Sequence, residues 1–427
     1  MSDAVIDLGE LRDGSDPDPL PRPPSSRGRP LRTALVALLV LVGLAASTPT
    51  APREVMTLPA GPGSDALVTD DLLVLVEPLS EPGQRQVRAT RLPGGELAWR
   101  ASLPTEGRYW GVAQQGETLL VTGHEVGADG QGTLTIALDR QTGAYRWQQP
   151  GNVTALSDGA LLLWSAGENG GALRAVDPCC GTVRWQMSVD PGVDLSFHEG
   201  GYGVDRLVLR HPDGPTEIRE AATGAVLARA DVRPPGGSGV VSVQPLGDLL
   251  VTIGGRTAMI TAYGLDDLRQ RWSVPSGEAM FASDCGAIIC VLTRSGGVRT
   301  IDAATGAPRW SDDRWGWVWP SAGRLLASSV GSSPSGVENL VVLDPPTGRV
   351  LAELGRWEVA QYASDGPLIG VRRHPGGGLL VARLDVRAGT VRTLDVLPGA
   401  GGECQTLTGQ LLCRRRDGNF GLWRLPS

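Results

Sequence analysis

A short unit recurs along most of this chain, and it restricts the possible folds more than any other feature. Its most complete copy is IDAATGAPRW, residues 301–310. Related copies are LDRQTGAYRW ending at Trp147, VDPCCGTVRW ending at Trp185, RLPGGELAW ending at Trp99, and GLDDLRQRW, which ends at Trp272 and lacks the glycine. Three more copies, REAATGAVLA, LDPPTGRVLA and LDVRAGTVRT, lack the tryptophan. Such internal repetition indicates an architecture of similar units packed side by side.

The repeat marks are evenly spaced. At an average step of about 42 residues, a length typical of small supersecondary repeats, the marks are Gly95, Gly143, Gly181, Gly224, Leu268 in place of a glycine, Gly306, Gly348 and Gly389. Between marks, apolar runs of five to seven residues alternate with turns rich in Gly, Asp and Pro, as in residues 118–123, 160–166 and 249–254. Short runs of this kind predict strands, and no helical period follows residue 47.

Each unit holds about four such runs, which predicts an all-β fold, a β-propeller of four-stranded blades over residues 52–427. A single four-stranded sheet cannot bury both of its faces, so neighbouring units must cover it. Within the motif, glycine supplies a turn with positive φ. The Asp before it can accept hydrogen bonds from the turn amides.

The motif tryptophans, four residues after the glycine, are expected on the outer strand of each blade. There an indole can cover the gap between two blades. Burying one removes roughly 150–250 Å² from water, an upper bound of about 4–6 kcal/mol. The residues expected to dock blades in this way are Trp99, Trp147, Trp185, Trp272 and Trp310.

The pattern D-x-x-TG-x-x-x-W, most complete at Asp302–Trp310, resembles the pyrroloquinoline-quinone-like β-propeller superfamily over residues 56–427. This superfamily includes quinoprotein dehydrogenases and non-enzymatic scaffolds such as the outer-membrane-assembly lipoprotein, and we assign the chain to the second branch. The resemblance favours eight blades, whereas a literal count that includes the strands after residue 400 gives nine. Residues 53–60 can supply the missing outer strand of that last set and so close the ring.

The N-terminal region has a different character. Residues 1–31 are polar and rich in Pro and Ser, which predicts a disordered tail. Residues 33–50 carry no charge, which predicts a transmembrane signal anchor over residues 32–51. Arginines before this run place the tail in the cytoplasm and the propeller outside, as a single-pass protein of the cell membrane. A cleaved signal peptide, cut near Ala45 or Ser47, is the alternative.

The six cysteines are expected to be oxidised outside the membrane. Cys285 pairs with Cys290 and Cys404 pairs with Cys413 in this interpretation, each bond joining two neighbouring strands. Cys179 and Cys180 are adjacent and replace the residues of a TG turn. They form either a vicinal disulfide or two free thiols. A contact with a quinone cofactor, as in some quinoprotein dehydrogenases, is the third alternative.

The chemistry that the dehydrogenases require is not visible in the sequence. Calcium needs a cluster of oxygen ligands, and the chain has no acid-rich loop, no C-x-x-C-H motif and no histidine pair at metal spacing. We therefore predict no catalytic residue, no metal, no cofactor and no enzymatic activity. A quinone- or metal-dependent dehydrogenase is the alternative. The net charge of −7 argues against nucleic acid as a partner.

One segment departs from the repeat, SDDRWGWVWP at residues 311–320. Trp315, Trp317 and Trp319 alternate, which predicts one shared face on an innermost strand, either packed between blades or open to the channel. An open face, with Asp312 and Arg314 beside it, would suit sugar rings or peptide side chains. The sequence thus predicts a membrane-anchored, extracytoplasmic binding or scaffolding module, monomeric, with an envelope protein or glycan as its partner.

Overall fold

The structure is a computed structural model that describes residues 54–61, 63–69, 71–79, 84–104, 107–125, 132–165, 170–212, 214–232, 240–254, 259–275, 277–329, 336–360, 368–407 and 409–426. It divides the chain into Met1–Pro52 and Arg53–Ser427, and only the second unit is considered below. The tail predicted at residues 1–31 and the anchor predicted at residues 32–51 lie outside the described residues. Where the structure describes the chain, no helix has the length and apolar character needed to span a bilayer.

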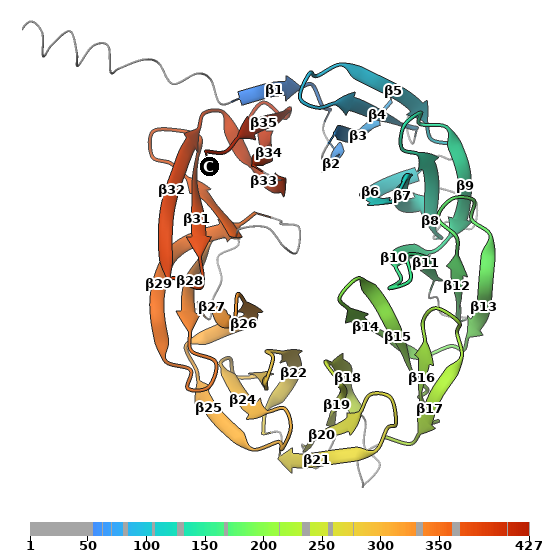
Figure 1. Cartoon of the computed structure of the whole chain (residues 1–427), viewed down its shortest axis with the longest axis vertical. Helices are drawn as coiled ribbons and strands as arrows, with labels where there is room; N and C mark the ends of the chain where they lie inside the picture. Colours follow the sequence, from blue (N-terminus) through green and yellow to red (C-terminus); the bar gives the residue numbers. More distant parts are fainter. Residues whose placement is uncertain are drawn as a thin grey trace, which may run out of the picture. The chain divides into compact units, whose positions relative to one another are not determined.

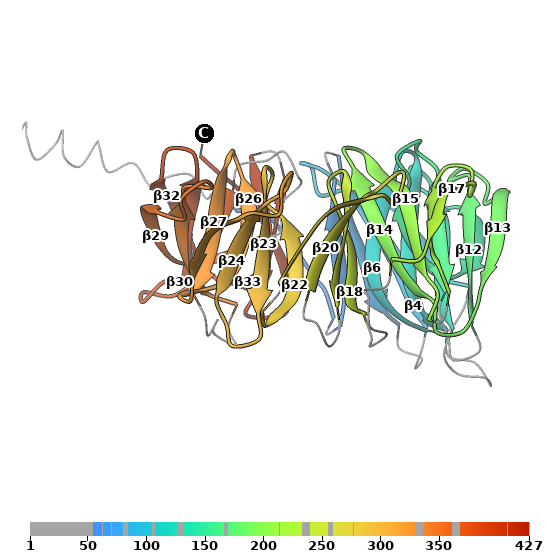
Figure 2. The same cartoon turned by 90° about the horizontal axis from the view of Figure 1, so that it is seen from below.

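The described part of the second unit is built from antiparallel strands, as predicted. Figure 1 shows its sheets arranged around a common centre, and in each sheet of four consecutive strands the first strand lies on the inner side. Figure 2 shows the same sheets from the side. This is the β-propeller architecture that the repeat predicts.

Six of the sheets contain four strands that are consecutive along the chain. Their strands are β2 (Asp65–Val68), β3 (Leu72–Pro78), β4 (Arg85–Arg91) and β5 (Leu97–Ser102); β6 (Gly107–Gln115), β7 (Thr118–Glu125), β8 (Thr133–Asp139) and β9 (Tyr145–Pro150); β10 (Asn152–Ala155), β11 (Leu161–Ser165), β12 (Gly171–Val176) and β13 (Val183–Val189); β14 (Asp194–Gly200), β15 (Gly203–Arg210), β16 (Thr216–Glu220) and β17 (Val226–Ala230); β18 (Val240–Leu246), β19 (Leu249–Gly254), β20 (Met259–Gly264) and β21 (Gln270–Pro275); β22 (Ala279–Asp284), β23 (Ile288–Thr293), β24 (Val298–Asp302) and β25 (Pro308–Asp312).

A seventh four-stranded sheet joins the two ends of the described chain. Its order is β1-β35-β34-β33, with β1 (Glu54–Leu58), β33 (Ala400–Leu407), β34 (Gln410–Arg415) and β35 (Phe420–Arg424). Strand β1 pairs antiparallel with β35, and Leu58 lies opposite Phe420. The prediction that residues 53–60 complete the last strand set is confirmed.

The remaining sheet has seven strands: β26 (Trp315–Ser321), β27 (Arg324–Ser329), β28 (Glu338–Leu343), β29 (Val350–Val359), β30 (Leu368–Arg373), β31 (Leu379–Asp385) and β32 (Thr390–Leu397). Strand β29 links two strand sets. Its residues from Val350 to Trp357 pair with β28, and its last two residues, Glu358 and Val359, pair with β30. Counting sheets in the described chain gives eight, and dividing this sheet at β29 gives nine strand sets. The preference for eight blades stays a prediction, since it depends on which count is used.

Burial follows the position of a strand within its sheet. The second strand of a set is apolar on both faces, as in β3, where Leu72 to Val76 are all buried. The outer strand alternates, as in β13, where exposed and half-buried residues follow one another. Both faces of the middle strands are covered by neighbouring sheets, so these strands form nearly continuous apolar runs. Nine hydrophobic clusters of described residues each join two successive strand sets, and one of them joins β1 and β35 to β3.

The TG turn is held by its aspartate. In the copy at residues 301–310, Asp302 Oδ1 accepts hydrogen bonds from the amides of Ala304 and Thr305 and from the Thr305 hydroxyl. Its other oxygen pairs with Arg309, with Nη2 at 2.5 Å from Oδ2. The hydrogen bond from Arg309, followed by those from Thr305, lowers the pKa of Asp302 to about 2. The arginine before the tryptophan is therefore part of the motif. The recurring dipeptide Arg-Trp is the sequence signal from which this role could be predicted.

The motif tryptophans contact the turn of the following strand set. Each indole covers the next motif glycine and donates its N–H to the carbonyl three residues before that glycine, at 2.8–3.1 Å. The pairs are Trp99 with Gly143, Trp147 with Gly181, Trp185 with Gly224, Trp272 with Gly306 and Trp310 with Gly348. These contacts are the geometry expected of blade-docking residues.

Where the tryptophan is missing, other residues make the contact. Ala228 stands at the tryptophan position of its unit, and the following glycine is replaced by Leu268, which adopts φ +50° and packs in the same cluster. At the closure of the ring, the side chain of Met56 on β1 lies against Gly95. These two junctions each combine one large residue with one small one, whereas at Gly389 the residue in contact is Ala352.

All six cysteines form disulfides in the described chain. Cys285–Cys290 and Cys404–Cys413 link neighbouring strands, as the sequence predicted. All four residues are buried. Cys179 and Cys180 form the vicinal disulfide that was one of three alternatives. This turn connects β12 to β13, the third and fourth strands of their sheet, and both cysteines are exposed.

Candidate functional site

Strand β26 carries the three alternating tryptophans, but the structure separates them. A register shift lies between Trp315 and Trp317. Trp315 is therefore buried together with Val318, whereas Trp317 is 50% exposed. Trp319 is half-buried and packs against the cluster on the other side. The expectation of one face shared by all three is wrong, because the bulge reverses the alternation after Trp315.

An exposed apolar patch remains around Trp317. Strand β22, the first strand of the preceding sheet, presents Met280 and Phe281, which are 43% and 38% exposed. The rings of Phe281 and Trp317 lie edge to face, with centroids 6.1 Å apart. Figure 1 shows both β22 and β26 on the inner side of their sheets. We call Met280, Phe281 and Trp317 the inner patch.

Sequence reasoning did not identify the two β22 residues. They lie in MFASD, a run that predicts a strand in which alternate side chains should be buried. A register shift between Ala279 and Phe281 instead leaves Met280 and Phe281 both exposed. A bulge of this kind leaves no distinct mark in the sequence, since it depends on the pairing with β23.

Asp312 and Arg314 form an ion pair with each other rather than contacts with the inner patch. The Arg314 guanidinium binds both oxygens of Asp312, with Nε at 3.0 Å from Oδ1 and Nη2 at 2.7 Å from Oδ2. This hydrogen bond is the main reason why the pKa of Asp312 lies below its ordinary value. The guanidinium also stacks over Trp315, 4.8 Å from the ring centroid. The pair thus covers buried Trp315 at the turn that leads into β26.

Residues suited to metal binding are scattered in the described part of the chain. No three side chains of the types His, Cys, Asp and Glu come together there in a way that could hold a metal ion. His198 and Asp205 form a close pair, with Nδ1 2.6 Å from Oδ1. They line a cavity of about 260 Å³ together with Arg206, which pairs with Asp266 at 2.9 Å.

Comparison with known proteins identifies the family. The family model described as "Outer membrane protein assembly factor BamB" matches residues 83–202 and 217–366, more than half of the chain. The chain belongs to this family. The matched residues begin just before β4 and end between β29 and β30, and they include both strands of the inner patch.

Several solved structures are similar to this BamB family member at low identity. BamB from Moraxella catarrhalis is 13% identical with a TM-score of 0.44, over 87% of this chain and 97% of that one. The computationally designed Ika8 protein is 16% identical with a TM-score of 0.46, over 75% and 98%. The dihydro-heme d1 dehydrogenase NirN, solved in complex with DHE, is 14% identical with a TM-score of 0.44, over 70% and 66%. No curated protein matches the chain.

Proposed function

We propose that this protein is a membrane-anchored, extracytoplasmic β-propeller that acts as a binding or scaffolding module of the cell envelope. The observation that carries the proposal is the inner patch. Two aromatic rings and a methionine from two neighbouring sheets are exposed side by side. Contiguous exposed apolar side chains commonly mark an interaction site, and aromatic residues and Met are enriched at interface centres.

A protein partner is the first choice for the inner patch. The family description names an assembly factor for outer membrane proteins, a role that consists of contacts with other polypeptides. An aromatic and methionine surface accepts varied apolar side chains. A glycan is the second choice, since exposed indoles also stack on sugar rings.

The test uses the full-length chain and its Trp317→Ala and Phe281→Ala variants as baits in pull-downs from native membranes. We expect an envelope protein that is retained by the unaltered chain and lost with both variants. Tyr202→Ala is the matched control, because Tyr202 is 91% exposed and lies in the turn between β14 and β15. Retention of every partner by both patch variants would exclude the patch as the docking site. A glycan partner would instead appear as quenching of tryptophan fluorescence by envelope glycans in the unaltered protein, and this quenching would be absent from the Trp317→Ala variant.

The proposed anchor is tested separately. We propose that residues 32–51 remain on the mature protein and hold it in the membrane with residues 1–31 in the cytoplasm. Mass spectrometry of the membrane-bound protein should then detect peptides from residues 1–30. A mature N-terminus near Thr48 would show that a signal peptide is removed.

The alternative function, a quinone- or metal-dependent dehydrogenase, predicts different behaviour. Protein reconstituted with pyrroloquinoline quinone and Ca²⁺ would then bind the chromophore and reduce an acceptor dye with an alcohol as substrate. Under our proposal neither the bound chromophore nor the dye reduction appears. A saturable dye reduction that requires both additions would replace the scaffold proposal.

A further inference from the structure

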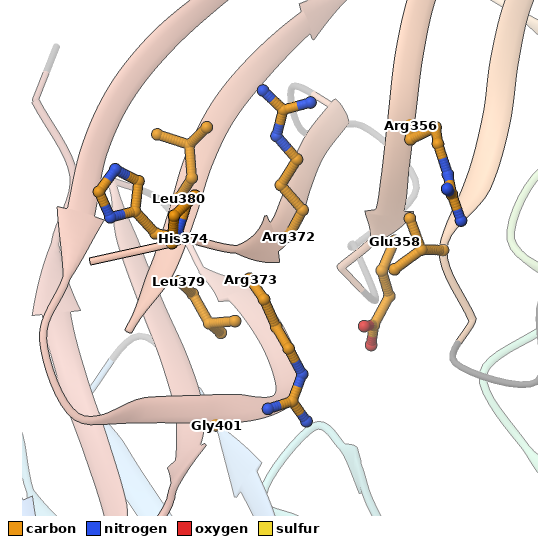
Figure 3. Close-up of a pocket in the computed structure, with 10 residues that line it drawn as sticks. Arg356, Glu358, Arg372, Arg373, His374, Leu379, Leu380 and Gly401 are labelled. Atoms are coloured by element: carbon orange, nitrogen blue, oxygen red, sulfur yellow. The ribbon is translucent and has the colours of Figure 1, made fainter. Parts of the chain in front are cut away.

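The largest cavity of the described chain, about 810 Å³, does not gather its charged side chains around one point. Figure 3 shows Arg372 and Arg373 pointing to opposite sides of β30. Both are exposed, and so is Arg356. A more specific feature lies in the turn between β12 and β13, where DPCCG (residues 177–181) stands in place of DAATG (residues 302–306).

The disulfide in this turn differs from the other two in its exposure. Cys179 and Cys180 are both exposed. The other four cysteines are at most 5% exposed and form the bonds Cys285–Cys290 and Cys404–Cys413. A thiolate must reach a sulfur atom to open a disulfide, so exposed disulfides are the labile ones in proteins. The adjacent pair is therefore accessible to a reductant while burial protects the other two bonds.

A neighbouring hydroxyl distinguishes the two sulfur atoms of the pair. The Thr182 hydroxyl donates a hydrogen bond to Cys180 Sγ, with 3.4 Å between the two atoms. A hydrogen bond to a thiolate favours its charged form, and a better stabilised thiolate leaves faster in disulfide exchange. We therefore expect Cys180 to be the leaving thiolate and Cys179 Sγ to be the atom that is attacked.

The aspartate of this turn is bound differently from the aspartate of the regular turn. Asp302 accepts hydrogen bonds from two amides and from the Thr305 hydroxyl of its own turn. In the described structure the side chain of Asp177 accepts hydrogen bonds from Arg184 alone, with Nε at 2.6 Å from Oδ1. Because this aspartate does not hold the turn amides, the turn can change its shape when the disulfide opens.

The residues on either side of the pair contact the preceding sheet. The Pro178 carbonyl accepts the indole N–H of Trp147 at 2.9 Å, and a Cβ at Gly181 would lie 2.7 Å from Trp147 Cγ. Trp147 is 6% exposed. A change in the backbone between Pro178 and Gly181 therefore reaches a buried indole at the junction of two sheets.

We propose that Cys179–Cys180 is a thiol–disulfide exchange site that accepts electrons from a dithiol, and that Trp147 responds to the state of the bond. One thiolate of the dithiol attacks Cys179 Sγ, the bond between the two Sγ atoms breaks, and its electron pair leaves on Cys180 Sγ. The second thiol of the dithiol then attacks the mixed disulfide and releases Cys179. The dithiol is oxidised to its cyclic disulfide, and its two protons pass to the two cysteine sulfurs. The proposal does not depend on the scaffold function.

The test treats the folded full-length protein with dithiothreitol and labels the new thiols with a maleimide. We expect peptide mapping to find label on Cys179 and Cys180 at least about tenfold faster than on the other four cysteines, because burial restricts exchange. Labelling of all six in protein unfolded by guanidinium verifies that both reagents are sufficient. Equal rates in the folded protein would overturn the proposal. Label on the adjacent pair before dithiothreitol is added would also overturn it, because the bond would then be absent.

The assigned order of attack is tested with Thr182→Val. This variant should slow the reduction of the pair about three- to tenfold, as loss of one hydrogen bond does. Thr305→Val is the matched control, since Thr305 is an exposed threonine of a turn without cysteines, and it should leave the rate unchanged. An unaltered rate in Thr182→Val would contradict Cys180 as the favoured leaving group.

The link to Trp147 is tested by fluorescence. Reduction should change the tryptophan fluorescence of the unaltered protein, because the turn contacts Trp147 on both sides of the pair. The change should be absent from Trp147→Phe and from the variant in which Cys179 and Cys180 are both replaced by Ser, and thermal midpoints verify that these variants fold. The same change in Trp147→Phe, or no change in the unaltered protein once the pair is reduced, would overturn this part of the proposal.

Discussion

The indole of Trp310 lies directly over Gly348 of the following strand set and donates its N–H to the Pro345 carbonyl at 2.8 Å. A Cβ at Gly348 would come within 2.5 Å of Trp310 Cδ2. The backbone at Gly348 has φ +68°, a conformation that side chains disfavour. Glycine is thus required at this position for two reasons. The turn needs a positive φ, and the indole of Trp310 leaves no room for a side chain.

Gly348→Ala separates these two requirements when it is compared with Gly323→Ala. Gly323 has a similar φ of +75°, but a Cβ there would meet nothing within 4 Å. Gly323→Ala should cost only the backbone strain, about 1–2 kcal/mol. Gly348→Ala should cost roughly 1–3 kcal/mol more, because the added methyl group displaces the indole. Urea unfolding followed by tryptophan fluorescence measures the difference, and equal losses would show that the ring tolerates the methyl group.

Ala228 and Leu268 replace the tryptophan and glycine of the regular junction, which predicts a compensating pair of substitutions. Ala228→Trp alone should destabilise the protein by overpacking, about 1–3 kcal/mol, and Leu268→Gly alone by leaving a cavity, about 2–5 kcal/mol. The double variant should recover at least about 1 kcal/mol relative to the sum of the two. Urea midpoints of the four proteins measure this coupling. Additive losses would mean that the two side chains do not share one space.

The repeat predicted the strands, the turns and the closure of the ring, because each of these depends on local patterns that recur. The bulges in β22 and β26 were not predictable, since they arise from pairing between strands. The prediction that Trp315, Trp317 and Trp319 share one face is wrong for this reason.

Asp302 gives a prediction about pH. Its folded pKa of about 2 lies below the ordinary value of 3.8, mainly because of the hydrogen bond from Arg309. Its contribution to stability is therefore complete above about pH 4 and is lost as the pH falls toward 2. Carboxyl chemical shifts should place the midpoint near 2, and Arg309→Gln should move it upward. Arg100→Gln should leave it unchanged, and a midpoint near 3.8 in the unaltered protein would contradict the turn geometry.

The disulfides should differ in their effect on stability. Replacing Cys404 and Cys413 by Ser removes a link over nine positions in sequence and should cost about 2–3 kcal/mol. Replacing the adjacent Cys179 and Cys180 removes almost no loop constraint, so the cost should stay below about 1 kcal/mol. Thermal unfolding of both double variants, with and without reductant, measures this. A larger loss from the exposed vicinal pair would show that its turn depends on the bond.

Strand β1 closes the ring, so a charge placed in its buried face should open it. Leu58 is 5% exposed and packs with Phe420 and Leu422 of β35. Leu58→Asp places a carboxylate in this apolar cluster and should detach β1, because an unpaired buried charge costs more than the pairing of one short strand provides. The neighbouring Thr57→Asp is the control, since Thr57 is exposed. We expect limited proteolysis to cleave the Leu58→Asp variant near residue 60 and to leave the Thr57→Asp variant intact. Equal resistance of the two variants would show that the ring stays closed without the Leu58 contact.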